Sequence, residues 1–483
     1  MSRNLVSALF ALQPHLVPWL SVQDALAVYS THPTLSEARV SVIRQRVNVV
    51  VPSDSDFDTA FTVLSGICAH VTNVSFEEVE AMGALSLLAW PCLGSLVVPV
   101  PDQDLPSLIV MNAPNLRTLT LNGEAKDLHL VSVLSLLNAD TLANLSNLSV
   151  SRVSLQHIHA LKSLHALSTL HITHGHLVDL DAIVSLAGLE ALTDLSLFAS
   201  SGIHDIVFVS EYAHRLTCLN LGNMELRNWS PVFNLHLLKH LQLSRSNIED
   251  ISLIGNLTQL ESLDISSTHV NCIYALASLA PTLRSLSLAM LDLKADNDMR
   301  ANPILAQLTH LHTLNLSGCS FEHSTVLEFL KPLQVLRKLN LSHTGVRNLR
   351  SLTHLTNLEI LYLYGSRAVS LDALAGLPRL RAVGLSGSLF LRDVVALALC
   401  TQLRDVGLSG TKVEGGIAFL VHALPRLHNL FLVDVWIGEH DAALMLDARV
   451  ERVVRRYKHQ VSSTATEDPE MQEMELRYKM NVM

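Results

Sequence analysis

The chain has 483 residues with a formal net charge of −10 at pH 7, and 49% of its residues are hydrophobic while 16% are charged. An apolar fraction this high predicts a large buried core and excludes a wholly disordered chain. The acidic balance argues against a general nucleic-acid binder, because phosphate contacts require many cations. No uninterrupted apolar run of about 18 residues occurs, so we expect no membrane-spanning helix.

Residues 1–46 show helical patterning before the first strand-like run, VNVVV at 47–51. A segment containing Leu and Trp19 is followed by Ser21, a suitable N-cap, and by the helical stretch DALAV. This order resembles a degenerate F-box, which implies a segment that binds the adaptor subunit of a ubiquitin ligase. The alternative is a plain helical cap over the apolar end of a repeat domain.

A six-residue phrase, L-x-x-L-x-L, recurs from residue 71 to residue 432, for example as LKHLQL at 238 and LHTLNL at 311. Alternate side chains of a strand point to opposite faces, so these leucines share one face that a single repeat cannot bury alone. The fourth residues of the sixteen copies are 74, 96, 119, 148, 170, 195, 219, 241, 263, 286, 314, 339, 361, 383, 406 and 430.

The pattern resembles the leucine-rich repeat family, whose strand motif reads L-x-x-L-x-L-x-x-N/C-x-L. The resemblance implies an α/β solenoid, a curved horseshoe of about sixteen repeats with parallel strands on the concave face and helical caps at both ends. We therefore expect an N-terminal cap over 1–46, the solenoid over 47–437, a basic helix over 438–461 and a flexible acidic and polar tail over 462–483.

The family's inward-facing Asn is rarely Asn in this chain. Hydroxyl and thiol groups can hydrogen-bond the backbone there with a shorter reach, so we expect structural roles for them and no reactive thiol at Cys319. The residues at this position are Ser246, Thr268, Cys319, Thr344, Ser366, Ser388 and Thr411.

The stretch HITHGH at 171–176 holds three histidines, and a zinc site requires three or four convergent ligands. The repeat instead assigns each histidine to a different column, so we expect no metal site, and His171 becomes a titratable group on the concave face. The predicted columns are His171 with Ser149 and Ser196, His174 with Arg152 and Ala199, and His176 with Ser154 and Ser201.

The residue between the last two leucines of each copy faces the concave side, and most residues in this column are small and uncharged. Near the C-terminus the column changes to Tyr362, Gly384, Gly407 and Phe431, with Tyr364 beside it. This order predicts a shallow trough with aromatic walls, the kind of surface that anchors protein partners. The alternative is that the glycines fit tight curvature and the rings pack structurally.

A line of cations lies one position after the first leucine of several copies and predicts a basic flank beside the trough. Its members are Lys239, Arg284, Arg337, Arg381 and Arg404. The alternative is an ordinary solvated surface.

In the predicted C-terminal helix, apolar residues fall on one side at helical spacing and basic residues crowd the rest. This predicts either a cap with a solvated basic face or a docking helix for an acidic partner. The apolar residues are Val450, Val453, Val454, Tyr457 and Val461, and the basic ones are Arg449, Arg452, Arg455, Arg456 and Lys458.

The sequence contains no phosphate loop and no dinucleotide-binding glycine motif. GLSGS at 384 and GLSGT at 407 lack the final glycine of a nucleophile elbow and share one repeat phase. We therefore expect neither an enzyme nor a cofactor. The six cysteines are scattered singly, which favours reduced thiols in an intracellular, cytoplasmic or cytoskeletal protein.

The sequence therefore predicts a non-catalytic scaffold or adaptor that binds a protein partner on its concave face. Three alternatives stay open: a substrate receptor of a ubiquitin ligase, a structural component of a cytoskeletal, axonemal or ribonucleoprotein assembly, and a secreted or surface receptor. Nucleic acid is expected only within a larger particle. The receptor alternative depends on the N-x-S/T sequons, among them those at Asn315 and Asn340, most of which arise from the repeated string N-L-S.

Overall fold

The computed structural model divides into two compact units, Met1–Leu238 and Lys239–Met483, each considered by itself below. The predicted segments 1–46, 438–461 and 462–483 lie outside the residues that the structure describes. Those residues are 47–51, 71–76, 90–99, 113–123, 129–132, 144–156, 161, 163–177, 189–212, 214–292, 301–319, 326–432 and 435.

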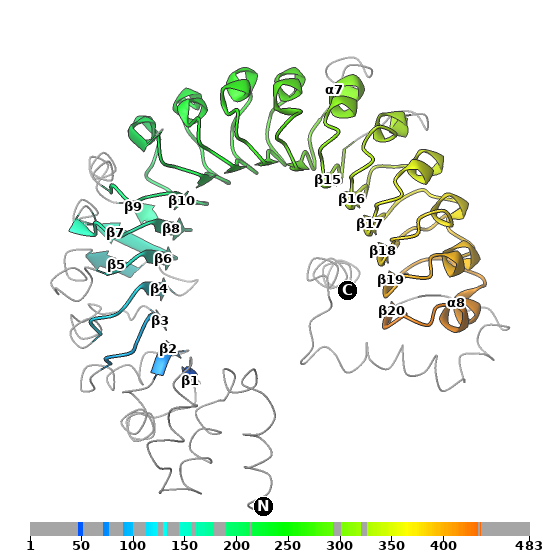
Figure 1. Cartoon of the computed structure of the whole chain (residues 1–483), viewed down its shortest axis with the longest axis horizontal. Coiled ribbons are helices and arrows are strands. Elements are labelled where there is room, and N and C mark those ends of the chain that lie inside the picture. The colour runs from blue at the N-terminus through cyan, green and yellow to red at the C-terminus, as the bar shows by residue number, and fades with distance from the viewer. Residues whose placement is uncertain are drawn as a thin grey trace, which may run out of the picture. The chain divides into compact units, whose positions relative to one another are not determined.

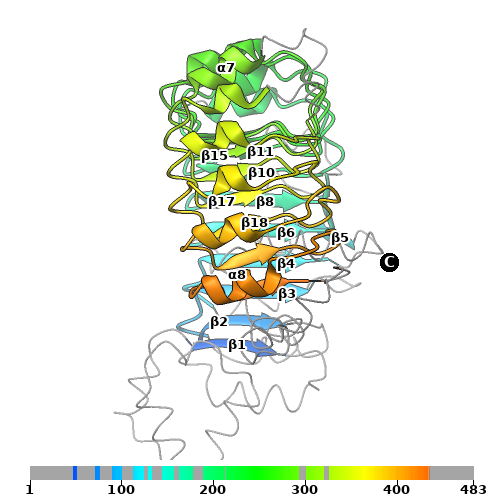
Figure 2. The ribbon, with the colours of Figure 1, turned by 90° about the vertical axis from the view of Figure 1, so that its right-hand side faces the viewer.

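The first unit contains a long parallel sheet and a short second one, and Figure 2 shows the successive strands of each unit running in the same direction. The second sheet consists of β5 (His129–Ser132), β7 (Val153–Gln156) and β9 (His176–Leu177). The long sheet consists of β1 (Val47–Val51), β2 (Val71–Phe76), β3 (Ser95–Pro99), β4 (Thr118–Asn122), β6 (Asn147–Ser151), β8 (Thr169–Thr173), β10 (Asp194–Ser196) and β11 (Cys218–Asn220). Two 3-10 helices, η6 (Val207–Tyr212) and η7 (Ser230–Asn234), lie in the return segments.

The second unit repeats one pattern, a three-residue strand followed by a short helical return. The strands are β12 (His240–Gln242), β13 (Ser262–Asp264), β14 (Ser285–Ser287), β15 (Thr313–Asn315), β16 (Lys338–Asn340), β17 (Ile360–Tyr362), β18 (Ala382–Gly384), β19 (Asp405–Gly407) and β20 (Asn429–Phe431). The returns hold η8 (Ser252–Asn256), η9 (Tyr274–Leu279), α7 (Ala301–Gln307), η11 (Val326–Leu330), η12 (Arg350–His354), η13 (Asp372–Leu374), η14 (Val395–Leu399) and α8 (Ile417–Ala423). Figure 1 shows the strands of this unit on its inner side, called the concave face below, and the helices on its outer side.

The predicted repeat register is confirmed in both units, because every one of the sixteen fourth positions lies in a strand and is at most 4% exposed. Leu263, for example, pairs with Leu241 on one side and with Leu286 on the other. Burial of a leucine side chain contributes about 2 kcal/mol, so the stacked leucines form a continuous core between the strands and the returns. The run VNVVV is also a strand, β1, which pairs with β2.

After β6, β8 and each of β10–β19, the chain turns through a residue with positive φ. Its N–H donates to a carbonyl of the next repeat, as from Arg245 to Ser266 at 2.8 Å and from Ser267 to Ala289 at 2.8 Å. A left-handed conformation costs a non-glycine residue about 1–2 kcal/mol. These residues adopt it because the stacking of the repeats requires it. Glycine occupies this place at Gly318, Gly365, Gly387 and Gly410, and other residues occupy it at Arg152, His174, Ala199, Asn223, Arg245, Ser267, Met290 and His343.

The hydroxyl and thiol groups that replace the family's inward-facing Asn have the predicted structural role. Most of these hydroxyls donate to the carbonyl three residues earlier, as from Ser246 to Leu243 at 2.6 Å. The thiol of Cys319 instead reaches Leu288 O of the preceding repeat at 3.1 Å, as Ser388 reaches Leu363 O at 3.0 Å. Burial raises the pKa of the Cys319 thiol to about 11, so the group stays protonated and unreactive.

Replacement of Arg245 tests the positive-φ turn. Arg245→Gly relieves the left-handed strain and is expected to raise the free energy of unfolding by about 1 kcal/mol, whereas Arg245→Val should lower it. Arg347 is equally exposed and has no positive φ, so Arg347→Gly should give no gain. Urea unfolding of the three variants measures the difference, and equal effects of glycine at the two positions would contradict the strain.

The cysteines provide a second test of the fold. Cys319 and Cys400 are buried with thiol pKa values raised to about 11, whereas Cys92 and Cys272 are exposed. Alkylation of the native protein at pH 8, read by peptide mass spectrometry, should label the exposed pair and spare the buried pair. In guanidinium all four should react. If native Cys319 were labelled as fast as Cys272, the core around Cys319 would be open to solvent.

Candidate functional site

The concave face of β12–β16 is open and polar. In β13, β14, β15 and β16 a buried leucine lies between two half-buried side chains that point to this face, and in β12 the two flanking residues are exposed. We call these ten side chains the open face: His240, Gln242, Ser262, Asp264, Ser285, Ser287, Thr313, Asn315, Lys338 and Asn340.

Some open-face residues also hold the backbone turn. Oδ1 of Asp264 accepts from the N–H of Ser266 at 2.9 Å, and Asn315 and Asn340 accept in the same way from residues two positions later. This turn explains why the string L-N-L-S recurs, and with it the sequons. Ser262, Ser285, Thr313 and Gln242 are the open-face side chains best placed for contacts beyond the chain.

The predicted basic flank contains two glutamates as well as the cations. Arg284 lies 3.8 Å from Glu261, and Glu359 lies 4.0 Å from Arg337 and 3.2 Å from Arg381. Both glutamates occupy the same repeat position as the cations, one place after the first leucine, so a complete reading of that column would have found them. Lys239 is exposed and Arg404 is half-buried. Surface ion pairs of this kind contribute little to stability but lower the positive charge of the flank.

The concave face of β17–β20 differs because it is closed. Tyr362, Gly384, Gly407 and Phe431 are cross-strand neighbours, in the predicted row. The expected trough is not open, however, because Tyr362 and Phe431 are 0% and 3% exposed and pack with Tyr364 into one buried cluster.

The Tyr364 ring occupies the space over Gly384. It stacks on Tyr362 with ring centroids 5.8 Å apart, and a Cβ added to Gly384 would lie 2.5 Å from its Cζ. Only glycine at position 384 leaves room for the Tyr364 ring, and the ring covers the backbone there. Partner binding by these residues stays a prediction.

A buried carboxylate lies in the same closed face. Asp405 is 4% exposed, has Ala382 and Asn429 as cross-strand neighbours, and accepts a hydrogen bond from Nδ2 of Asn429 at 2.5 Å. Sequence reasoning missed it because only the glycine column was compared between repeats. A charged group this deeply buried is costly unless a cation or several donors surround it.

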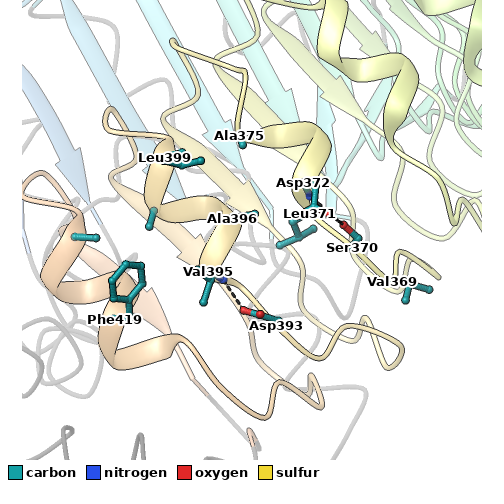
Figure 3. Close-up of a pocket in the computed structure, with 12 residues that line it drawn as sticks. Val369, Ser370, Leu371, Asp372, Ala375, Asp393, Val395, Ala396, Leu399 and Phe419 are labelled. Carbon is teal, nitrogen blue, oxygen red and sulfur yellow. Dashed lines mark hydrogen bonds between the residues drawn. The ribbon is translucent and has the colours of Figure 1, made fainter.

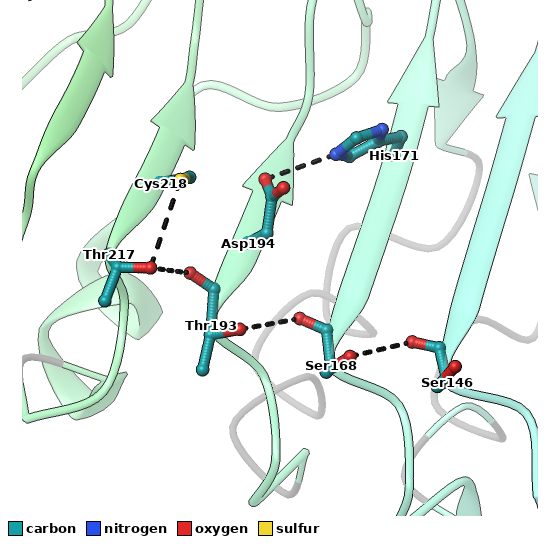
Figure 4. Close-up of polar contacts among 7 residues, drawn as sticks. All are labelled: Ser146, Ser168, His171, Thr193, Asp194, Thr217 and Cys218. Carbon is teal, nitrogen blue, oxygen red and sulfur yellow. Dashed lines mark hydrogen bonds and ion pairs between the residues drawn. The ribbon is translucent and has the colours of Figure 1, made fainter. Parts of the chain in front are cut away.

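In the first unit the concave face carries an imidazole–carboxylate pair. Nε2 of His171 lies 3.2 Å from Oδ1 of Asp194 on the next strand, and each side chain is about one-third exposed (Figure 4). Ser149 and Ser196 are the cross-strand neighbours of His171, as predicted, but the contact with Asp194 was missed.

Below this pair, at the start of the strands, runs a ladder of hydroxyls that Figure 4 also shows. Ser146, Ser168, Thr193 and Thr217 each donate to the backbone carbonyl of the corresponding residue in the preceding repeat, at 3.2–3.3 Å. The acceptor of the first is Arg117. The ladder is structural, because each hydroxyl bonds a carbonyl that also accepts backbone N–H groups where the chain enters the sheet.

The histidines of HITHGH are separated by the fold as expected. His174 takes the positive-φ turn and meets the Phe198 ring edge to face at 5.4 Å. His176 lies in β9, where Ser154 is its register neighbour, and its Nδ1 lies 2.9 Å from the hydroxyl of Ser201. Across the described ranges, no three His, Cys, Asp or Glu side chains converge as metal ligands would.

An apolar groove lies on the outer side of the second unit, between η13, η14 and α8 (Figure 3). Its volume is about 750 Å³, and Val395, Leu399 and Phe419 in its lining are 42–67% exposed. Asp393 accepts from the N–H of Val395 at 2.7 Å and so starts η14. Sequence reasoning missed the groove, although Leu399 stands where other repeats have polar Asn256 and His354.

None of the helices in the described ranges has the length and apolar content that a bilayer crossing requires.

Substitution of Gly384 tests the closed face. Gly384→Ala places a methyl group against the Tyr364 ring and is expected to lower the free energy of unfolding by about 1–3 kcal/mol. Gly376 has no atom within 4 Å of an added Cβ, so Gly376→Ala is a matched control that should be neutral or slightly stabilising. Thermal and urea unfolding measure both. Equal stability of the two variants would mean that the ring does not cover Gly384.

No protein-family model matches the sequence. The disease resistance protein RPP2A of Arabidopsis thaliana is 29% identical over an alignment of 187 positions, which covers 36% of this chain and 13% of that protein. The match therefore spans a small part of that relative's own length.

A solved structure shows the same fold, and a second is similar in sequence and shape. A leucine-rich repeat protein of Leptospira interrogans superposes with a TM-score of 0.55 at 18% identity, covering 79% of this chain and 95% of the other. An internalin of Listeria monocytogenes gives a TM-score of 0.45 at 24% identity, over 65% of this chain and 80% of its own. With sixteen strands in repeat register, the chain has the fold of leucine-rich repeat proteins.

Proposed function

We propose that this protein is a non-catalytic scaffold or adaptor and that it binds a protein partner on the open face of β12–β16. The observation that carries the proposal is the continuity of that face: five successive strands present half-buried or exposed polar side chains in one register. Strands lie about 4.8 Å apart, so the face extends over about 20 Å, which suits a protein segment better than a small ligand.

The charges of the open face favour a protein over a nucleic acid. Asp264 and Lys338 bring opposite charges, and Glu261 and Glu359 lower the positive charge of the flank beside them. Nζ of Lys338 also lies 5.4 Å from the centre of the Tyr362 ring. Nucleic-acid affinity depends on many cations near phosphates, which this face lacks.

The proposal extends to an intracellular location. Cys92 and Cys272 are exposed free thiols, and Cys319 and Cys400 are buried ones. Free thiols are typical of reducing compartments, whereas secreted repeat domains commonly oxidise theirs. The ubiquitin-ligase alternative depends on residues 1–46. The alternative of a structural component in a large assembly depends on the identity of the partner.

Substitutions on the open face test the function. Gln242→Arg, Ser262→Arg and Ser285→Arg together add bulk and charge without touching the turn-forming Asp264. We expect recovery of the specific partner from cells to fall about tenfold or more, because unpaired charges are costly at an interface. Quantitative mass spectrometry of affinity-purified wild-type and variant protein measures the recovery.

The matched control carries the same three added charges on exposed turns away from the face, as Thr258→Arg, Gln259→Arg and Thr309→Arg. It should recover partners as the wild type does. If the open-face variant recovers the same proteins at the same yield, this face is not the binding site. Recovery of ligase subunits that is lost on deletion of residues 1–46 would favour the ubiquitin-ligase alternative.

A further inference from the structure

We propose that the basic segment 438–461 of this same chain binds, as an amphipathic helix, the outer apolar groove between η13, η14 and α8. Its apolar side would fill the groove, and its cations would face the two carboxylates of the groove lining. The interaction leaves the open face of β12–β16 accessible, so it does not depend on the function proposed above. It would attach the C-terminal part of the chain to the outer side of the second unit.

The first support is the concentration of exposed apolar side chains at this groove. Of the twelve exposed large hydrophobic residues in the described part of the chain, six lie within positions 369–419. Val369, Val395, Leu399 and Phe419 line the groove and are 42–67% exposed. Contiguous apolar surface is costly to leave in water, and it commonly marks a binding site.

The second support is the shape of the groove. η13 spans three residues, whereas η12 and η14 span five each and α8 spans seven, so the shorter return leaves a hollow beside the longer ones. Val369 precedes η13 and Phe419 belongs to α8, on opposite sides of η14 (Figure 3). Neighbouring helices pack about 8–10 Å apart, so a groove that crosses from η13 to α8 extends over about 16–20 Å.

The segment has the complementary apolar pattern. Its anchors fall at i, i+3, i+4, i+7 and i+11, the spacing with which one side of a helix occupies an apolar groove. They are Val450, Val453, Val454, Tyr457 and Val461. At a rise of 1.5 Å per residue these anchors extend over about 16 Å, which matches the groove. Valine is a weak helix former, so we expect the helix to be stable only when its apolar side is covered.

The charges also match. Asp372 and Asp393 are exposed and line the groove, and none of the other described residues that line it is charged. Asp372 accepts from the Ser370 hydroxyl at 2.8 Å, and Asp393 accepts from the N–H of Val395 at 2.7 Å, so both carboxylates are held in place. Five basic residues lie within positions 449–458, beside the apolar anchors. Two fixed carboxylates favour a basic helix over an acidic or neutral one.

The length of the connecting chain permits the contact. α8, which carries Phe419, directly precedes β20 in the chain, so the segment follows the last repeat that forms the groove. Eighteen residues separate Phe431 from Val450. They span about 27 Å even when helical, which exceeds the roughly 10 Å between packed layers of secondary structure. A segment tethered this near has a high effective concentration, so modest contacts keep it bound.

Hydroxyl-radical footprinting of the purified full-length protein tests the proposal. Phe419 lines the groove and Phe390 does not, and their side chains are 53% and 51% exposed, so Phe390 is a matched internal reference. Mass spectrometry measures the oxidation of each ring. In the wild type we expect Phe419 to react about fivefold more slowly than Phe390, at low and at high protein concentration, because the tethered segment covers it.

Two variants of the segment should remove this protection. One changes Arg449, Arg452, Arg455, Arg456 and Lys458 to Gln, and the other combines Val453→Asp with Val454→Asp. In each, the oxidation of Phe419 should rise by about fivefold, to that of Phe390. The matched control changes five exposed arginines elsewhere to Gln, namely Arg117, Arg227, Arg284, Arg347 and Arg350, and should keep the protection.

The role of the carboxylates is tested by Asp372→Asn with Asp393→Asn, which keeps an oxygen acceptor at both positions and removes both charges. The change should raise the oxidation of Phe419 in the wild-type background and add nothing in the five-Gln background, because both sets of substitutions remove the same pairs. An equal rise in both backgrounds would overturn the pairing. Cys400, which follows Leu399 and is buried, reports by alkylation in every variant whether this repeat stays folded.

Other outcomes would overturn the inference as a whole. If Phe419 reacts as fast as Phe390 in the wild type, the groove is uncovered. Protection that persists in both segment variants would show that a different part of the chain covers Phe419. Protection that appears only at high concentration would indicate a second copy of the chain, and protection that appears only after a separate protein is added would indicate an external partner.

Discussion

Parallel pairing of leucine strands is the interaction on which the rest of this structure depends. A three-residue strand such as Ser262–Asp264 has one buried leucine, and that leucine is covered only because Leu241 and Leu286 lie beside it. The pairing fixes where the chain must turn, which is why residues as different as Arg245 and Met290 adopt the same left-handed conformation. It also fixes which hydroxyls are buried, and those hydroxyls then bond the nearest carbonyl.

Burial of the leucines does not determine the side chains on the concave face, and these side chains differ between two parts of the second unit. Over β12–β16 the positions are polar and partly solvated. Over β17–β20 they combine aromatic rings, glycine and a buried carboxylate. The same backbone thus supports one open polar surface and one closed surface.

The strands were predictable because leucine spacing directly reflects which side chains share a face. The solvent exposure of the concave side chains was less predictable. The row from Tyr362 to Phe431 was found, but its closure depends on how the Tyr364 ring packs over Gly384, which spacing does not encode. The column of the basic flank also holds Glu261 and Glu359, and Asp405 was missed because only the glycine column was compared between repeats. The F-box-like segment 1–46 and the basic helix 438–461 stay predictions.

The return between β14 and β15 contains an α-helix and is longer than the return between β13 and β14, yet Leu286 and Leu314 pair in the same register as their neighbours. Length added on the outer side therefore leaves the alignment of the strands intact. Outer segments such as α7 can be extended, shortened or exchanged while the residues that face the concave side keep their mutual positions. Such returns are natural places to graft a reporter or a second binding element without redesigning the sheet.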